Sequence, residues 1–326
     1  MISRRNFVTT ILGATGLAAC VPSLDNFLHA QANDTPRVRH YRRDGAAVVV
    51  EGQTLLAAFT FAEPLRTLDG SLPVLIEPAS IGGDTITEPQ PLYFYRADDD
   101  GRTWLTFLTA PLDVVPGRYT LELNAISGHN IARQWQLPYA FQQGVYRNSF
   151  LTLSKEFSAP PPAIVARQQA DFQATIAALT QPKIERQWSA SFILPTSGGF
   201  RSNYGDRRTV NRVKHYRHAG IDMKAGLGTP IRAMNDGVIA LSADHWAPGQ
   251  NIILNHGGGV FTKYIHLSRR DAQVGDAVKR GDVIALSGNT GGQKPGPHLH
   301  MDVFANGAAV NPLQFMQVAE QFLKAI

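Results

Sequence analysis

The segment His218-Ala219-Gly220-Ile221-Asp222 places an imidazole and a carboxylate four residues apart, with a glycine between them. Further along the chain come Tyr264-Ile265-His266-Leu267-Ser268 and then His298-Leu299-His300. Together these segments supply four histidines and one carboxylate. A catalytic zinc ion needs three nitrogen or oxygen ligands and one coordination position left open. The three segments are sufficient for such a site, with two imidazoles left over for proton transfer.

The spacing of the last two histidines supports this interpretation. Residues 298–304 alternate well enough to form a β-strand. Because residues two apart on a strand point to the same face, we expect His298 and His300 to face one cleft. A single histidine is more often a surface or packed core residue than a ligand, so His-x-His alone is a weak signal. Its occurrence together with His266 and the segment at His218 in one glycine-rich region favours a metal site.

Several further motifs flank these histidines in a characteristic order. They are Arg201-Ser202-Asn203-Tyr204-Gly205, Gly228-Thr229-Pro230-Ile231, Asp236-Gly237-Val238-Ile239, Gly288-Asn289-Thr290-Gly291 and Gly296-Pro297-His298-Leu299-His300. With the histidine segments, they make residues 192–312 resemble the lysostaphin-type zinc endopeptidases of bacterial cell walls. The resemblance implies a metallopeptidase domain that holds one Zn²⁺ per chain.

The resemblance assigns the metal to His218, Asp222 and His300. The residues alone leave open whether His298 or His300 touches the metal, and the family pattern gives it to the second. Two neutral imidazoles and one carboxylate leave a Zn²⁺ site with a net charge near +1. Such a site lowers the pKa of a bound water toward about 7 and polarises a peptide carbonyl.

The resemblance also implies roles for side chains around the metal. His266 and His298 are the unligated pair: one takes a proton from the water, and the other holds the carbonyl oxygen or protonates the leaving amine. Tyr204 lies where relatives carry a residue beside the oxyanion, with a packed loop tyrosine as the alternative interpretation. Asp302, where many relatives have glutamate, is a candidate acceptor for the second nitrogen of a ligand imidazole.

Residues 1–32 are expected to be an export signal. Ser3-Arg4-Arg5-Asn6-Phe7-Val8 precedes a mild apolar run, as in signals of the twin-arginine type, and an ordinary secretory signal is the alternative. Cleavage after Ala32 is favoured over cleavage before Cys20, which would attach a lipid there. The protein is therefore expected in the periplasm or cell envelope, either free or as a membrane-anchored lipoprotein. Cys20 is the single cysteine, so no intramolecular disulfide can form.

The rest of the chain is expected to be mostly β. Short apolar runs separated by turn residues predict an immunoglobulin-like β-sandwich over residues 35–146. Residues 147–187 are expected to form a connector with a helix from Ala163 to Leu179. Residues 188–326 are expected to form the antiparallel β metallopeptidase domain, ending in a helix from Pro312 that Asn311 caps.

The charge pattern narrows the choice of partner. The net charge of +5 is a mild basic excess without a long Lys/Arg run, which argues against nucleic acid and suits an anionic polymer such as peptidoglycan. The basic residues from Asp206 to Arg217 are expected to form a solvated loop, with contact to substrate carboxylates as the alternative.

We therefore expect an exported zinc endopeptidase that hydrolyses peptide bonds in peptidoglycan, in cross-links or in stem peptides. One alternative is a non-catalytic regulator of another cell-wall hydrolase; such family members usually lack metal ligands, and here the set is complete. A second alternative is a protease of glycine-rich proteins. The sequence makes no prediction of oligomeric state.

Overall fold

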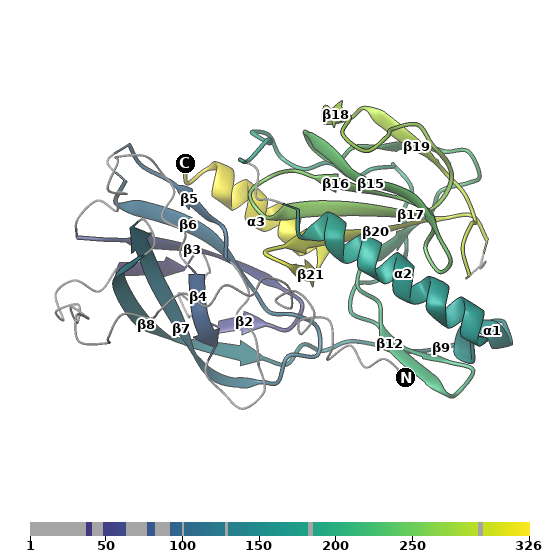
Figure 1. Ribbon diagram of the computed structural model, residues 1–326, viewed down its shortest axis with the longest axis horizontal. Coiled ribbons are helices and arrows are strands. Elements are labelled where there is room, and N and C mark those ends of the chain that lie inside the picture. Colours follow the sequence, from purple (N-terminus) through teal and green to yellow (C-terminus); the bar gives the residue numbers. More distant parts are fainter. Residues whose placement is uncertain are drawn as a thin grey trace.

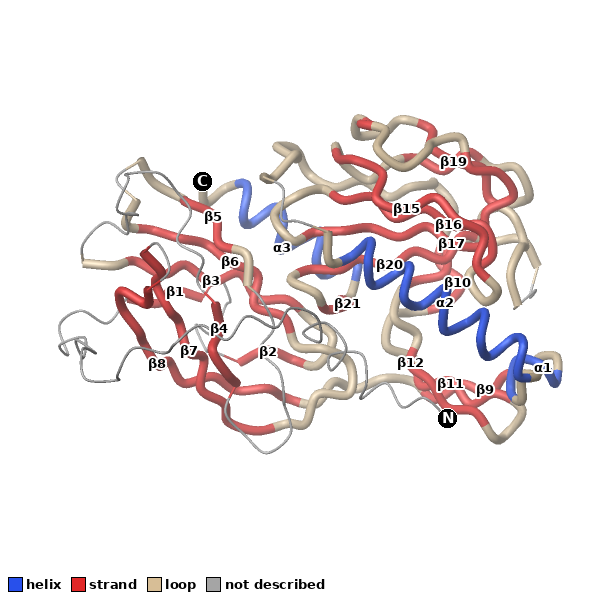
Figure 2. Tube along the Cα trace, viewed as in Figure 1, coloured by secondary structure: helices blue, strands red, loops and turns tan. Residues whose placement is uncertain are grey.

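The computed structural model describes residues 37–40, 48–62, 77–81, 92–99, 101–127, 130–181, 185–292 and 296–326. The predicted export signal, with Cys20 and Ala32, lies outside these residues. The fold is mostly β, as the sequence predicted. Figures 1 and 2 show two β regions side by side, one built from β1 to β8 and one from the later strands, with helix α3 (Pro312–Leu323) between them.

Two four-stranded sheets make up the N-terminal β region. The first has the order β1 (Arg37–His40), β3 (Thr54–Thr60), β6 (Thr103–Thr109) and β5 (Phe94–Arg96). The second has the order β2 (Val48–Val50), β8 (Asn130–Gln142), β7 (Gly117–Ser127) and β4 (Glu77–Ile81). Phe59, Trp104 and Trp135 come from both sheets and share one apolar cluster, so the sheets pack face to face. The immunoglobulin-like assignment stays a prediction.

Strand β3 is buried on both faces because its apolar residues alternate between two cores. Leu55 and Phe59 belong to the cluster between the N-terminal sheets, whereas Leu56 and Ala58 belong to the core of the C-terminal region. Helix α3 contributes Phe315 to that second core. The two β regions therefore share apolar packing in addition to the connector that joins them.

A ten-stranded sheet dominates the C-terminal region, and its strand pairs are antiparallel. Its main order is β10 (Phe200–Ser202), β13 (Ile221–Met223), β20 (Leu299–Ala305), β17 (Val260–Arg270), β16 (Gly249–Asn255), β15 (Gly237–His245) and β18 (Ala277–Val278). Off this path lie β14 (Pro230–Arg232), β19 (Val283–Ser287) and β21 (Ala308–Val310). The predicted antiparallel β character of this region is confirmed.

Residues 206–217 do not form the solvated loop that the sequence predicted. They contain a hairpin of β11 (Arg207–Val210) and β12 (Lys214–Arg217), and β11 also pairs in parallel with β9 (Asn148–Leu151). Asn211 and Arg212 turn the hairpin with φ angles of 49° and 62°, in the left-handed region. The prediction failed because β11 and β12 are polar and because β9 lies far away in the sequence.

Two of the described helices lie where the sequence predicted helices, and a third, short helix was not predicted. Helix α1 (Lys155–Ser158) is short, and α2 (Pro162–Leu179) starts with proline at its first position, where no N–H is needed. Asn311 caps α3: its side chain accepts hydrogen bonds from the N–H groups of Leu313 and Gln314. In the described part of the chain, no helix is both long and apolar enough to cross a membrane.

Helix α2 lies against one face of the C-terminal sheet, where it contacts β15. In Figure 1 it crosses in front of β17 and β20. Ala178 packs in a cluster with Phe261 and Phe304, and the Asp171 side chain accepts a hydrogen bond from the N–H of Trp246 at 2.7 Å. Phe304 points to the same face of β20 as His300, because even-numbered residues of this strand alternate with the core residues. The connector therefore covers part of the sheet face that carries the histidines.

Candidate metal centre

Strand register brings the first two candidate ligands together. Leu299 and Met301 of β20 point into the core, which turns His300 to the opposite face. In β13 the core residues Ile221 and Met223 turn Asp222 to that same face. Asp222 pairs directly with His300 across the two strands. Directly paired residues on one face have their Cβ atoms about 5 Å apart, so their side chains meet.

His218 completes a compact cluster of three donor atoms. Its Nε2 atom lies 3.1 Å from Asp222 Oδ1 and 2.9 Å from His300 Nδ1, and that Nδ1 lies 2.8 Å from Asp222 Oδ1. Donors bound tetrahedrally to zinc at about 2.0 Å are separated by about 3.3 Å. The three atoms therefore lie close to the separations that one zinc ion would impose.

The hydrogen bonds on the far side of each ring decide what the cluster can bind. His218 Nδ1–H donates to the Asn203 carbonyl at 2.7 Å, and His300 Nε2–H donates to Asp302 at 2.7 Å. Neutral rings held this way turn lone pairs toward Asp222, whose carboxylate only accepts. Three acceptors that face one another are stabilised by a positive charge between them, either a proton on His300 Nδ1 or a metal ion. Two imidazoles and a carboxylate suit Zn²⁺, so the residues fit the metal that the sequence predicts.

The electrostatics of the cluster also favour a positive charge among the three side chains. Burial lowers the pKa of His300, but Asp302 and Asp222 outweigh it and raise the pKa to about 9. Burial opposes ionisation of Asp222 as well, yet its contacts with His218 and His300 hold its pKa well below the usual range. The field among these atoms therefore favours positive charge.

Gly220 allows β13 to approach this cluster. A Cβ atom at Gly220 would overlap the Met301 carbonyl and Asp302 Oδ1, and it would lie 2.8 Å from His300 Nε2. The carbonyl belongs to the strand backbone and cannot rotate away. The glycine of the first motif is thus required by close packing against the His300–Asp302 pair.

The second oxygen of Asp222 has two partners that the sequence analysis did not single out. Oδ2 accepts a short hydrogen bond from Ser202 Oγ and a bond of 2.9 Å from Arg208 Nη2. Arg208 also donates to Ser202 Oγ at 2.7 Å. Nothing local distinguishes Arg208 from the other basic residues of 201–217; only the hairpin of β11 and β12 directs it to the carboxylate.

His266 reaches the cluster through a β-bulge. Strand β17 carries an extra residue relative to β16 between Tyr264 and Leu267, and His266 has a φ of 64°. Bulges and left-handed residues of this kind are common beside active sites, where they redirect a side chain. The rings of His266 and His298 have centroids 4.8 Å apart, and His298 Nε2 lies 3.9 Å from Asp222 Oδ1.

Both of these rings are oriented by backbone carbonyls. His266 Nδ1–H donates to the Thr290 carbonyl at 2.8 Å, and His298 Nδ1–H donates to the Gly296 carbonyl at 2.9 Å. Each ring therefore keeps Nε2 as its basic nitrogen. Burial, followed by the nearby His300 and His298, lowers the pKa of His266 to about 3; burial also lowers the pKa of His298. Both rings are neutral at physiological pH, which is the form that accepts a proton.

Tyr204 does not share these contacts. Its side chain is only 4% exposed, its hydroxyl donates to the Ala309 carbonyl at 2.8 Å, and its ring packs edge-on against Tyr146. These contacts favour the packed-tyrosine interpretation over a place beside the oxyanion. Burial raises the pKa of Tyr204 well above its ordinary value, so the hydroxyl stays protonated.

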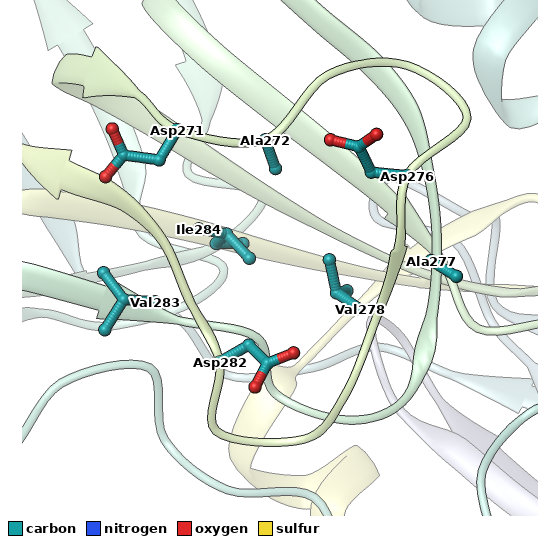
Figure 3. Close-up of a pocket in the computed structure, with 8 residues that line it drawn as sticks. All are labelled: Asp271, Ala272, Asp276, Ala277, Val278, Asp282, Val283 and Ile284. Carbon is teal, nitrogen blue, oxygen red and sulfur yellow. The ribbon is translucent and has the colours of Figure 1, made fainter.

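A surface depression lies elsewhere, beside β18 and β19 (Figure 3). It is lined by Asp271, Ala272, Asp276, Ala277, Val278, Asp282, Val283 and Ile284. Two of its carboxylates stabilise local turns by accepting backbone hydrogen bonds. Asp276 accepts from Gln273 N–H at 2.8 Å, and Asp282 accepts from Lys279 N–H at 2.7 Å. None of the clustered histidines lines it, so it is separate from the metal centre.

Comparison with known proteins agrees with this geometry. Residues 216–312 match peptidase family M23. The C-terminal region contains a family M23 peptidase domain. The resemblance to lysostaphin-type enzymes is thereby confirmed for this part of the chain.

Curated relatives align with about a third of the chain. The peptidoglycan DD-endopeptidase ShyA of Vibrio cholerae is 37% identical over 114 residues, which cover 35% of this chain and 26% of ShyA. The DD-carboxypeptidase/endopeptidase Mpg of Neisseria meningitidis is 43% identical over 96 residues, or 29% of this chain and 22% of Mpg. The glycyl-glycine endopeptidase ALE-1 of Staphylococcus capitis is 37% identical over 116 residues, or 34% and 31%. The chain thus aligns with less than a third of the length of these relatives.

One solved structure shares more of the architecture. A crystal structure described as a peptidase M23 from Pseudomonas aeruginosa superimposes with a TM-score of 0.58 at 24% identity. The superposition covers 82% of this chain and 95% of that one. At this identity the match shows a common fold that extends beyond the M23 domain.

Proposed function

We propose that this protein is a zinc-dependent endopeptidase that hydrolyses peptide bonds in peptidoglycan. One observation carries the proposal: three candidate ligand atoms, His218 Nε2, Asp222 Oδ1 and His300 Nδ1, lie within 4.8 Å of one another. Two neutral imidazoles, on His266 and His298, stand beside this group. This arrangement supports the proposal, because it groups candidate metal ligands with candidate proton acceptors.

The metal would be held by His218, Asp222 and His300, with Asp302 orienting His300. Zinc bound there supplies Lewis acidity, which lowers the pKa of a water ligand and polarises a peptide carbonyl. The basic Nε2 of His266 is free to take the proton from the attacking water. Nε2 of His298, once protonated, is available to hold the carbonyl oxygen or to protonate the leaving amine.

Peptidoglycan is proposed as the substrate because named relatives of the domain include peptidoglycan endopeptidases. Relatives named as DD-endopeptidases and one named as a glycyl-glycine endopeptidase have similar identities to this chain. The proposal therefore covers both bond types. We favour the direct cross-link because the leader suggests an envelope with two membranes.

The test combines a metal assay with digestion of isolated sacculi. The purified wild type is expected to carry about one zinc per chain, and mass spectrometry of the digest should show that cross-linked dimers disappear. His266→Ala should bind zinc but leave the dimers intact. Oligoglycine and cross-linked muropeptides, assayed in parallel, identify the bond. A wild type without zinc that leaves sacculi intact would refute the proposal.

Export to the periplasm or cell envelope is also proposed, on the basis of residues 1–32. The mass of the mature protein distinguishes the two cleavage sites: cleavage after Ala32 gives a free protein that begins at Asn33, whereas lipid on Cys20 adds acyl chains. Changing Arg4 and Arg5 to lysine together should retain the precursor in the cytoplasm if the signal is of the twin-arginine type.

A further inference from the structure

The N-terminal β region contributes a buried carboxylate that contacts the segment next to the metal centre. Glu51 follows β2 and is only 2% exposed. Its Oε1 accepts from Asp113 N–H at 2.8 Å, and its Oε2 accepts from Gly144 N–H at 3.1 Å. The Tyr146 hydroxyl donates a short hydrogen bond to the Glu51 carbonyl. Glu51 is thus held firmly by its own part of the chain.

The partner of this carboxylate is Arg217, the residue directly before the ligand His218. Arg217 Nη1 donates to Glu51 Oε1 at 2.8 Å and to Asp113 Oδ1 at 2.6 Å. The Arg217 side chain is 7% exposed, and Tyr146 lies over its guanidinium at 4.7 Å. A buried arginine of this kind depends strongly on its carboxylate, because an unpaired buried charge is costly.

Arg217 also contacts the segment that orients His218. Its Nε–H donates to the Gly205 carbonyl at 3.0 Å. Gly205 N–H donates to the His218 carbonyl at 2.7 Å, and His218 N–H donates to the Asp206 carbonyl at 2.9 Å. The same segment supplies the Asn203 carbonyl that accepts from His218 Nδ1–H. The ring of His218 is therefore oriented by a loop that Arg217 holds in place.

We propose that Glu51 is a positioning residue for the metal centre, acting through Arg217 and the 203–206 loop on the orientation of His218. The N-terminal β region then contributes to metal affinity without touching the metal. This inference rests on the proposed zinc site but not on the identity of the substrate.

A purely architectural role for Glu51 makes a different prediction. Loss of a buried ion pair would then lower the melting temperature but leave the zinc affinity of the folded protein unchanged. A positioning role requires weaker zinc binding and an altered coordination geometry in protein that is still folded. Loss of an outer partner of a metal ligand typically weakens binding about 10- to 100-fold.

The experiment measures zinc affinity of the purified full chain by competition with a chromophoric chelator, and the visible spectrum after Co²⁺ substitution. E51Q is expected to raise the zinc Kd about tenfold or more and to change the Co²⁺ bands. The control is D244N, which removes the exposed ion pair between Arg167 of α2 and Asp244 of β15. D244N should match the wild type in both measurements.

Two further variants make the outcome decisive. R217K keeps the positive charge but loses the Nε bond to Gly205, so it should weaken zinc binding even though a charge remains near Glu51. E51D retains the carboxylate and should recover part of the affinity that E51Q loses. If E51Q does not fold, the zinc Kd and Co²⁺ spectra of R217K and E51D are compared with those of the wild type instead.

The results separate this inference from the proposed function. Wild-type zinc affinity and Co²⁺ spectra in both E51Q and R217K would overturn the positioning role, while digestion of sacculi by the wild type would leave the function standing. A wild type that binds zinc but leaves sacculi intact would remove the substrate proposal and not the positioning role. Wild type without zinc affinity would overturn both.

Discussion

Two of the buried histidine sites in the C-terminal region, His256 and the metal centre, differ in the partner of the second ring nitrogen. His256 is fully buried; its Nδ1–H donates to the Asp236 carbonyl at 2.7 Å, and its Nε2 lies 2.9 Å from Thr262 Oγ1. Each nitrogen thus meets a complementary partner. At the metal centre, one ring nitrogen of His218 and one of His300 also donate a hydrogen bond, to Asn203 and Asp302. The other nitrogen of each ring faces another acceptor. Burial does not distinguish a ligand from a structural histidine; the partner of the second nitrogen does.

Removal of a metal ligand is expected to have the largest effect on zinc binding. Zinc sites with four protein ligands bind with roughly 10–16 kcal/mol, or about 3 kcal/mol per ligand, so His300→Ala is expected to raise the zinc Kd about 100-fold or more. His256→Ala is expected to lower the melting temperature and leave the zinc Kd unchanged. Chelator competition and thermal melts of both variants check this. Equal loss of zinc in the two variants would contradict the distinction.

The pH dependence of stability should identify the structural histidine. Burial lowers the pKa of His256 to about 4. The unfolded chain, with a histidine pKa near 6.5, therefore binds the proton first as the pH falls. The stability contributed by this residue is present above pH 6.5 and declines toward pH 4, by at most about 3 kcal/mol.

The measurement is denaturant unfolding of the wild type and His256→Asn at several pH values between 4 and 7.5. The variant should be less stable at pH 7.5 and should lose less stability on acidification, because it lacks the titrating ring. Parallel pH profiles for the two proteins would rule out His256 as the source.

Gly220 tests the close packing of β13 and β20 beside the metal centre. Gly220→Ala places a methyl group against the Met301 carbonyl and is expected to cost about 1–3 kcal/mol of stability, with weaker zinc binding. The matched control is Gly226→Ala, where the nearest atom to a Cβ is 3.8 Å away. Chemical unfolding and zinc titration compare the two. Identical behaviour would show that β13 can shift to accommodate the methyl group.

Arg208 should give the smallest effect. Lysine at this position keeps a positive charge near Asp222 but cannot bridge Asp222 Oδ2 and Ser202 Oγ with the same planar group. Arg208→Lys is expected to raise the zinc Kd up to about tenfold, with little change in melting temperature. Arg207→Lys, at the exposed neighbouring position, is the control. An unchanged Kd in Arg208→Lys would mean that β13 alone orients the carboxylate.

Local patterns predicted much of the C-terminal region. Alternation in residues 298–304 correctly indicated a strand, and the proline and asparagine at the start of α3 correctly indicated where that helix begins. The residues of the metal cluster were also named in advance, through the family resemblance. By contrast, the β11–β12 hairpin was missed because its polar strands have no alternation, and its pairing with β9 joins distant segments.

The chemistry available to this protein is encoded locally: in the donor types, in the faces they occupy on their strands, and in the glycine that lets two strands approach. Which donors meet depends on tertiary packing, because the register between β13 and β20 joins Asp222 to His300 across a long stretch of chain. The contacts of Arg208 with Asp222 and of Glu51 with Arg217 likewise depend on tertiary packing. Alternation is a local property that each strand carries in its own residues, whereas contacts between distant segments depend on the packing of the whole chain.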